Sequence, residues 1–226
     1  MKNILRLMVI VSLCLVVSAS FANAALFTIT NGTTVDQQVD PLATAFSGVN
    51  YSNYNGTGQA MFGPQADTGY LWIYKNTLTD DISLGMLFDT YYSGSAGNAA
   101  ISFTGAPDNA FVENSDDPGE LLQTGAGTFS GNWSWGKFFN DGGYIGGLAV
   151  PPAPDWTMTV SLLSSVGIDS WYFLSGDAVN PTQYQLDMTQ DLIISDPLIP
   201  VPEPTTLLLL GAGLLGLGVF ARKRRK

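Results

Sequence analysis

The strongest constraint on the fold is the alternation of apolar and polar residues in short stretches that turn-forming clusters separate. In the segment WTMTVSL, residues 156–162, every second residue from Trp156 is apolar, and Thr157, Thr159 and Ser161 lie between them. Because successive side chains of a strand point to opposite faces, a period of two predicts a strand with one buried face. The segments TFSGNWSW (128–135) and YQLDM (184–188) repeat this pattern.

Nine segments have the alternation or the apolar composition of strands: 26–30, 70–75, 82–92, 100–105, 128–135, 156–162, 170–175, 184–188 and 191–195. Clusters such as NGTT, NYNGTG, SGSAGN and NDGG lie between them and are rich in residues that favour turns. One short helical turn is expected over residues 114–123. About nine short strands predict an all-β fold, a β-sandwich of jelly-roll or immunoglobulin-like type.

The N-terminal residues 1–24 have the three parts of a secretory signal peptide. Two basic residues and an apolar stretch come first, and small residues follow them. Ala22 and Ala24 form an A-x-A cleavage site, which predicts that the mature protein begins at Ala25. We therefore expect an N-terminal signal helix that is removed, and one folded domain over residues 25–200.

The C-terminal end combines a rigid motif, an apolar stretch and a basic terminus. Residues 205–221 contain no charged side chain, and a helix of that length spans about 25 Å, slightly less than a bilayer core of about 30 Å. We predict a transmembrane helix there. The positive-inside rule places the basic stop in the cytoplasm and the body outside. The stop consists of Arg222, Lys223, Arg224, Arg225 and Lys226.

This ending closely resembles the PEP-CTERM sorting domain of exported bacterial proteins. The motif consists of Val201, Pro202, Glu203 and Pro204, and it precedes a glycine- and leucine-rich stretch and the basic cluster. The resemblance implies an exosortase as processing partner and an inner-membrane anchor with the body in the periplasm before cleavage. It further implies delivery of the body to the cell surface or the exopolysaccharide matrix. An ordinary C-terminal anchor is the alternative.

Composition excludes several classes of site. The chain has no histidine, and its single cysteine, Cys14, lies in the signal peptide. Ser-His-Asp catalysis, Cys-His catalysis, histidine metal sites and disulfides in the body are therefore excluded. All 19 acidic residues lie between Ala25 and Pro204 with only Lys75 and Lys137, a formal charge of −17. Such a body repels nucleic acid, so no nucleic-acid partner is expected.

The densest acidic stretch is PDNAFVENSDDPGE, at residues 107–120, and it suggests the one cofactor to consider, calcium. Calcium takes six to eight oxygen ligands. The spacing of the acids does not match an EF-hand loop, and a solvated loop is the simpler interpretation. The candidate ligands are Asp108, Glu113, Asp116, Asp117 and Glu120.

Two further groups of residues are candidates for acting on or binding carbohydrate: a pair of acidic residues and a set of aromatic residues. Asp80 and Asp81 are adjacent on a predicted strand, so their side chains point to opposite faces and form a poor catalytic pair. Aromatic faces offer stacking platforms for sugars. Trp133, Trp135 and Trp156 fall on the apolar side of alternating strands, which favours the core. The exposed candidates are Tyr51, Tyr54, Tyr91 and Tyr92.

Three hypotheses for the body follow. The first is a non-catalytic surface or matrix protein with a structural or adhesive role, and no catalytic residues are predicted. The second is a carbohydrate-binding module that recognises extracellular polysaccharide. The third is a glycan-active or ester-active hydrolase without histidine. An open surface lined by exposed aromatic rings favours the second, and a cleft with two carboxylates and apolar walls favours the third.

Overall fold

The protein is described here from a computed structural model, and the described residues are 27–45, 47–48, 60–89, 94–115, 117–148 and 155–196. The chain divides into two units. One is Ala24–Pro197, which holds all of the described residues. The other combines Met1–Asn23 with Leu198–Lys226 and lies outside them. The predicted signal helix and transmembrane helix therefore lie outside the described residues.

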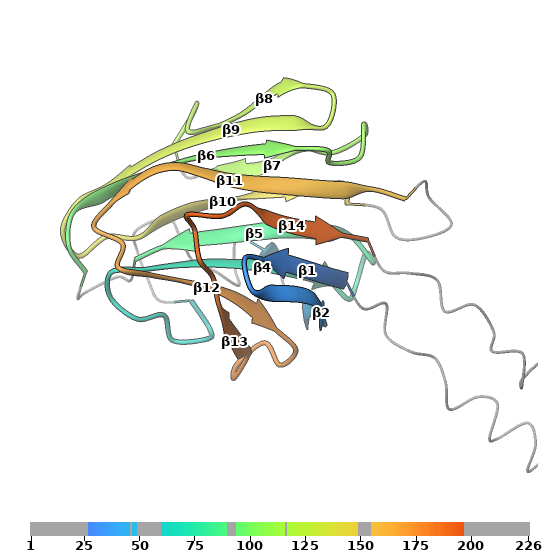
Figure 1. Cartoon of the computed structure of the whole chain (residues 1–226), viewed down its shortest axis with the longest axis horizontal. Helices are drawn as coiled ribbons and strands as arrows, with labels where there is room; N and C mark the ends of the chain where they lie inside the picture. The colour runs from blue at the N-terminus through green and yellow to red at the C-terminus, as the bar shows by residue number, and fades with distance from the viewer. Residues whose placement is uncertain are drawn as a thin grey trace, which may run out of the picture. The chain divides into compact units, whose positions relative to one another are not determined.

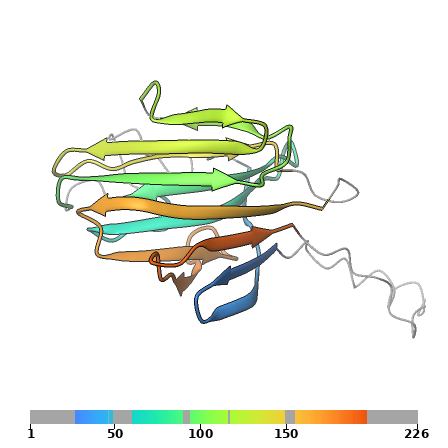
Figure 2. The same cartoon turned by 45° about the horizontal axis from the view of Figure 1, so that its top comes forward.

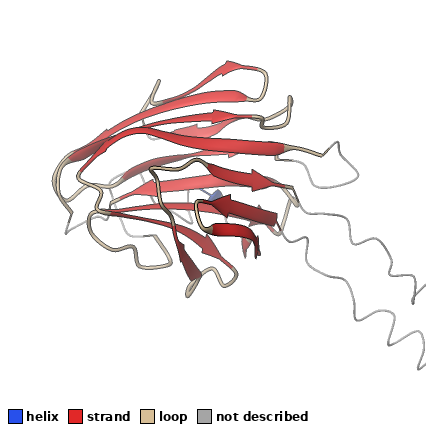
Figure 3. Cartoon of the chain, viewed as in Figure 1, coloured by secondary structure: helices blue, strands red, loops and turns tan. Residues whose placement is uncertain are grey.

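The described elements are fourteen strands in two sheets (Figures 1 and 3). The first sheet has seven strands, all antiparallel to their neighbours, and Figure 2 shows its outer face. Its order is β2 (Thr34–Val39), β1 (Phe27–Asn31), β14 (Leu192–Ser195), β11 (Thr157–Val166), β6 (Gly97–Thr104), β9 (Thr128–Trp135) and β8 (Leu121–Gly125).

The second sheet also has seven strands and contains two parallel pairs. Its order is β13 (Thr182–Gln185), β12 (Ser170–Ser175), β4 (Thr68–Asn76), β5 (Ile82–Phe88), β10 (Asp141–Gly146) and β7 (Phe111–Ser115). The short strand β3 (Leu42–Thr44) pairs with the last part of β4, and β12 pairs with its first part, both in parallel. Strand β4 therefore shares one edge between two partners.

The all-β prediction is confirmed, and each of the nine predicted segments overlaps a strand. The number of strands was underestimated, because β2, β3, β7, β8 and β10 were not predicted. These strands are short or polar, or contain adjacent glycines, so they lack a clear alternation. The predicted helical turn at 114–123 was wrong. Strand β7 ends at Ser115 and β8 begins at Leu121, with Gly119 between them at a φ of 96°.

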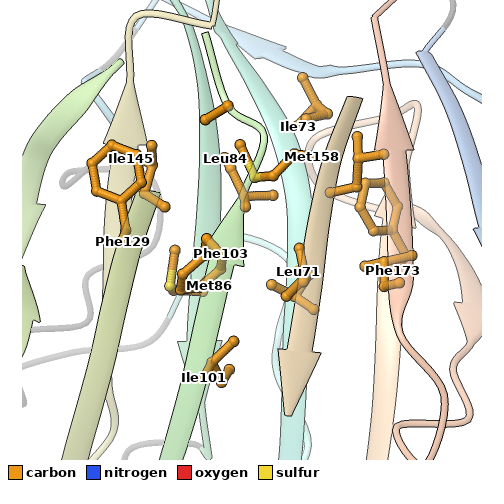
Figure 4. Packing of buried hydrophobic residues seen from close by; sticks show 14 of the residues in the cluster. Leu71, Ile73, Leu84, Met86, Ile101, Phe103, Phe129, Ile145, Met158 and Phe173 are labelled. Atoms are coloured by element: carbon orange, nitrogen blue, oxygen red, sulfur yellow. The ribbon is translucent and has the colours of Figure 1, made fainter. Parts of the chain in front are cut away.

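The main core lies between the two sheets. Inward-facing side chains of both sheets form one continuous buried cluster (Figure 4). Ile101 and Phe103 come from the first sheet, and Leu71, Leu84 and Met86 come from the second. Each of these side chains is fully buried, which stabilises the fold by about 1.5–3 kcal/mol per large apolar residue. The alternation seen in the sequence selects the residues that point inward.

A second core covers the outer face of the second sheet. Tyr70, Trp72 and Tyr74 alternate on β4 with the residues of the main core, and they too are buried. Ala60 and Phe62 pack against them from the segment before β4. The ring of Phe62 lies 5.1 Å from that of Tyr70 and 5.7 Å from that of Trp72, both edge to face. The central strands β4, β5 and β10 of the second sheet are therefore buried on both faces.

Candidate functional site

The two ends of the described body lie side by side. Strands β1 and β14 are antiparallel neighbours, and Thr28 is paired with Ser195. The first described residue, Phe27, and the last, Asp196, therefore lie at the same end of the sandwich (Figure 1). We call this end the tether end, because the chain continues from Asp196 into the sorting motif.

The opposite end, which we call the tip, includes the turn between β9 and β10. Strand β11 leads from one end to the other. Thr157 pairs with Ser195 at the tether end, and Val166 pairs with Asn98 at the far end. The neighbouring residue Gly97 pairs with Trp135, the last residue of β9. At about 3.3 Å per residue, β11 separates the two ends by about 30 Å.

The predicted sorting residues lie beyond the described part of the chain. This holds for the motif Val201–Pro204, the basic stop at 222–226 and the cleavage-site residues Ala22, Ala24 and Ala25. No helix among the described residues is long and apolar enough to cross a bilayer.

Comparison with known proteins confirms the C-terminal assignment. Residues 200–225 match the family model of the PEP-CTERM protein-sorting motif. No curated protein and no solved structure matches the chain. The C-terminal segment is therefore a PEP-CTERM sorting motif, which marks the chain as an exported protein that an exosortase processes. The match does not extend into the body, so the body is interpreted from its own residues.

The calcium candidates are spread over two loops and a strand. Asp108 lies in the β6–β7 turn and Glu113 on β7, whereas Asp117 and Glu120 lie in the β7–β8 loop. The loop is closed by its own hydrogen bonds. The backbone nitrogen of Asp117 donates to Oε2 of Glu120 at 3.1 Å, and that of Glu120 donates to the carbonyl of Asp117 at 3.4 Å. Asp116 lies outside the described residues.

Among the described residues, no three acidic side chains gather into a group suited to a metal ion. Asp117 and Glu120 form a solvent-exposed turn closed by hydrogen bonds, and their oxygens are not arranged around a common centre. Calcium binding stays a prediction from the sequence.

The tether end contains a shallow pocket with acidic and apolar walls. Its volume is about 320 Å³. Asp80, Asp81 and Glu113 supply carboxylates, and Phe111 is among the apolar residues that line it. Asp80 also forms an ion pair with Lys75, with 2.9 Å between Oδ1 and Nζ. The fold thus adds Glu113, from the unpredicted strand β7, to the Asp80–Asp81 pair that the sequence analysis considered.

The pKa of the Glu113 carboxyl group in this pocket is raised above its ordinary value. Desolvation by the surrounding atoms raises the pKa, although part of the side chain remains open to solvent. A hydrogen bond from Ser83 on β5 opposes this increase, and the nearby negative charge of Asp81 adds to it. Glu113 therefore holds its proton to a higher pH than an ordinary glutamate.

Three tryptophans are buried, as the alternation predicted. Trp133, Trp135 and Trp156 are buried at 1, 5 and 6% exposure, so their faces are part of the core. The Nε1 of Trp133 donates to the carbonyl of Gly142 at 3.2 Å, which satisfies its one donor. The four tyrosines that the sequence suggests as stacking candidates, Tyr51, Tyr54, Tyr91 and Tyr92, lie outside the described residues.

Sequence analysis missed the exposed phenylalanines. Phe111 is 49% exposed on β7, and Phe138 and Phe139 are 47% and 50% exposed between β9 and β10. The segment GKFFNDGG, at residues 136–143, contained a signal for the second pair, since two large apolar residues stand inside a turn cluster. Phe138 and Phe139 stand in a turn, so the alternation of a strand does not account for their apolar side chains. This position at the surface makes them candidates for a contact with a ligand.

Proposed function

We propose that this protein is an exported component of the cell surface or exopolysaccharide matrix with a structural or adhesive role. The observation that carries the proposal is the PEP-CTERM sorting motif at residues 200–225 behind a body that is an all-β sandwich. The tail holds the protein in the inner membrane, with the body in the periplasm, until an exosortase removes it.

The fold supports this order of events. The last strand, β14, ends at Ser195, so the whole sandwich lies before the motif. Strand β14 is held between β1 and β11 inside the first sheet. Cleavage at Pro202–Pro204 therefore removes none of the strands that the structure describes and breaks no pair between them. The processed body keeps its fold after it leaves the membrane.

Charge and composition support a non-catalytic role. The body combines a large excess of acidic residues with the absence of histidine and of a thiol, so it lacks the usual nucleophile and base pairs. A hydrolase that uses Asp81 and Glu113 is the second candidate, because their pocket has carboxylates and the apolar side chains of Ile82 and Leu148. Loss of oligosaccharide hydrolysis in Glu113→Gln would favour that candidate.

The sorting step is tested with Glu203→Ala. The substitution leaves the apolar stretch and the basic stop unchanged, so insertion should proceed as in the wild type. We expect full-length protein to accumulate in the inner membrane, detected with antibodies to the body and to an epitope after Lys226. Deletion of residues 205–226 should release the body directly to the periplasm.

The matched control is Asp117→Ala, which removes one exposed acid from the body and should be processed normally. If the Glu203→Ala protein loses its epitope and reaches the surface as fast as the wild type, the motif does not direct sorting. The surface and matrix proposal then loses its main support.

A further inference from the structure

The turn between β9 and β10 has an unusual backbone. The backbone nitrogen of Phe139 donates to the carbonyl of Gly136 at 3.1 Å, which closes a four-residue turn. Lys137 and Phe138 are its central residues, and Phe138 has a φ of 69°. A positive φ at the third position of such a turn ordinarily calls for glycine. A phenylalanine is retained here against the preference of the backbone.

The base of this turn is fixed on both sides. On β9, Trp135 is buried, and its Nε1 donates to the carbonyl of Ser95 at 3.0 Å. The ring of Trp135 stacks on that of Phe88, with 5.7 Å between the centroids. On β10, Asp141 accepts hydrogen bonds from the backbone nitrogens of Ser134 and Gly142. The turn is therefore held by the core beneath it, and its position is set before any ligand arrives.

The two phenylalanine rings are presented to solvent at this fixed position. Phe138 and Phe139 are each about half exposed. The ammonium group of Lys137 lies 4.8 Å from the centre of the Phe138 ring, within the range of a cation–π contact. Lys75, the other lysine of the body, is paired with Asp80 at the tether end. The tip thus combines exposed rings with the lysine that the tether end does not use.

We propose that the turn Gly136–Phe139 is a binding platform for the sugar rings of a neutral polysaccharide. Aromatic rings held in place bind the apolar C–H face of a pyranose by stacking, and a preformed platform avoids the entropic cost of ordering. The positive φ of Phe138 and the half-exposed rings on an anchored turn are the observations that point to a ligand. The choice of a matrix polysaccharide as the source rests on the proposed function.

Charge selects a neutral ligand. The stretch from Ala25 to Pro204 has a formal charge of −17, so acidic polysaccharides and anionic membranes are repelled as they approach. A neutral glycan is not repelled in this way. The platform also lies at the end opposite Asp196, where the chain continues into its membrane tail. A ligand at the tip can therefore be bound both before and after the tail is removed.

The test is affinity electrophoresis of the full chain in detergent through gels that contain a neutral glucan, mannan or galactan, or an acidic polyuronate. Retardation by at least one neutral polymer is expected. The double variant Phe138→Ala/Phe139→Ala should weaken this binding by about tenfold or more, because both stacking faces are removed. The matched control is Leu122→Ala, which removes an equally exposed apolar side chain from β8, outside both the turn and the pocket, and should bind as the wild type does.

A second variant separates binding from folding. Phe138→Gly suits the backbone of the turn and removes only the ring, so its melting temperature should be at least that of the wild type while its affinity is lost. Equal binding by the wild type and the double variant would overturn the proposal, as would binding only to the polyuronate or to phosphatidylcholine vesicles. Absence of binding to every neutral polymer would also overturn it. None of these results depends on exosortase processing, so the sorting proposal stands or falls separately with Glu203→Ala.

Discussion

The two sheets of this sandwich differ in how many of their faces are buried. In the first sheet, Met158 on β11 is buried in the core, and Thr157 beside it is exposed to solvent. In the second sheet, Leu71 and Trp72 are adjacent on β4, and both are fully buried. The first sheet therefore has a core face and an open face, whereas the central strands β4, β5 and β10 of the second sheet lie between two cores. Substitutions on the open face of the first sheet should have little effect, whereas both faces of these central strands are structural.

Close aromatic packing explains why the second sheet tolerates no side chain at certain positions. The ring of Trp72 lies across Gly85 on β5, and a Cβ atom built on Gly85 would come within 2.4 Å of it. Tyr144 on β10 packs edge to face against Trp72, with 5.8 Å between ring centroids. Because position 85 is a glycine, the Trp72 indole can occupy the space that a Cβ atom would take.

The largest expected effect is on stability, and it tests the difference in burial between the two sheets. Trp72→Ala should destabilise the protein by about 3–5 kcal/mol, because it opens a cavity in the outer core of the second sheet. Ser102→Ala is the matched control on the open face of the first sheet, where Ser102 lies between Ser161 and Ser130 of the neighbouring strands. It should change stability by about 0.5 kcal/mol or less. Urea denaturation of both variants measures the difference.

If Trp72→Ala unfolds at the same urea concentration as Ser102→Ala, the second sheet does not depend on its outer core. The two sheets would then be equivalent in stability, and the contrast drawn from their burial would be wrong.

The sequence predicted the first sheet better than the second, for a physical reason. Alternation is visible only where one face of a strand meets water, as on β9 and β11. On β4 both faces are apolar, so the run YLWIYK predicted a strand and left open what covers its second face. Strand β10 was missed because Gly142 and Gly143 resemble a turn, although they lie in a ladder with β5. A local pattern can indicate a strand, but it does not identify the distant strand with which it pairs.

The candidate functional sites also differ in how far the sequence alone could reveal them. The sorting motif is contiguous, so the sequence alone revealed it. The pocket at the tether end joins Asp81 to Glu113, which are far apart in the chain and meet only when β7 pairs with β10 beside β5. The platform at the tip is contiguous, and it was overlooked because its two phenylalanines stand in a segment that has turn composition.

The turn that leads from the first sheet to the second supplies the next prediction. Phe138→Gly relieves a backbone strain of about 1 kcal/mol, so it should raise the free energy of unfolding by a similar amount, less the small cost of glycine's flexibility in the unfolded chain. Phe139→Gly, at a residue without a positive φ, should lower stability. Thermal denaturation of the two single variants compares them. A loss of stability in Phe138→Gly equal to that in Phe139→Gly would show that the Phe138 ring is a packing group.

The smallest expected effect tests the edge of the second sheet, where Glu113 lies on β7. Burial raises the pKa of this carboxyl group above its ordinary value of 4.5, so the folded state binds the proton more tightly than the unfolded state. The stabilising contribution of protonated Glu113 is thus complete below pH 4.5 and is lost as the pH rises through the raised pKa. Glu113→Gln should therefore be more stable than the wild type at pH 7, and the difference should disappear below pH 4.5. Asp108→Asn removes the same charge from an exposed turn of the acidic body and corrects for general repulsion. If the two variants show the same pH dependence in urea denaturation, the partial desolvation of the Glu113 carboxyl group does not affect stability, and the edge at β7 behaves like the open face of the first sheet.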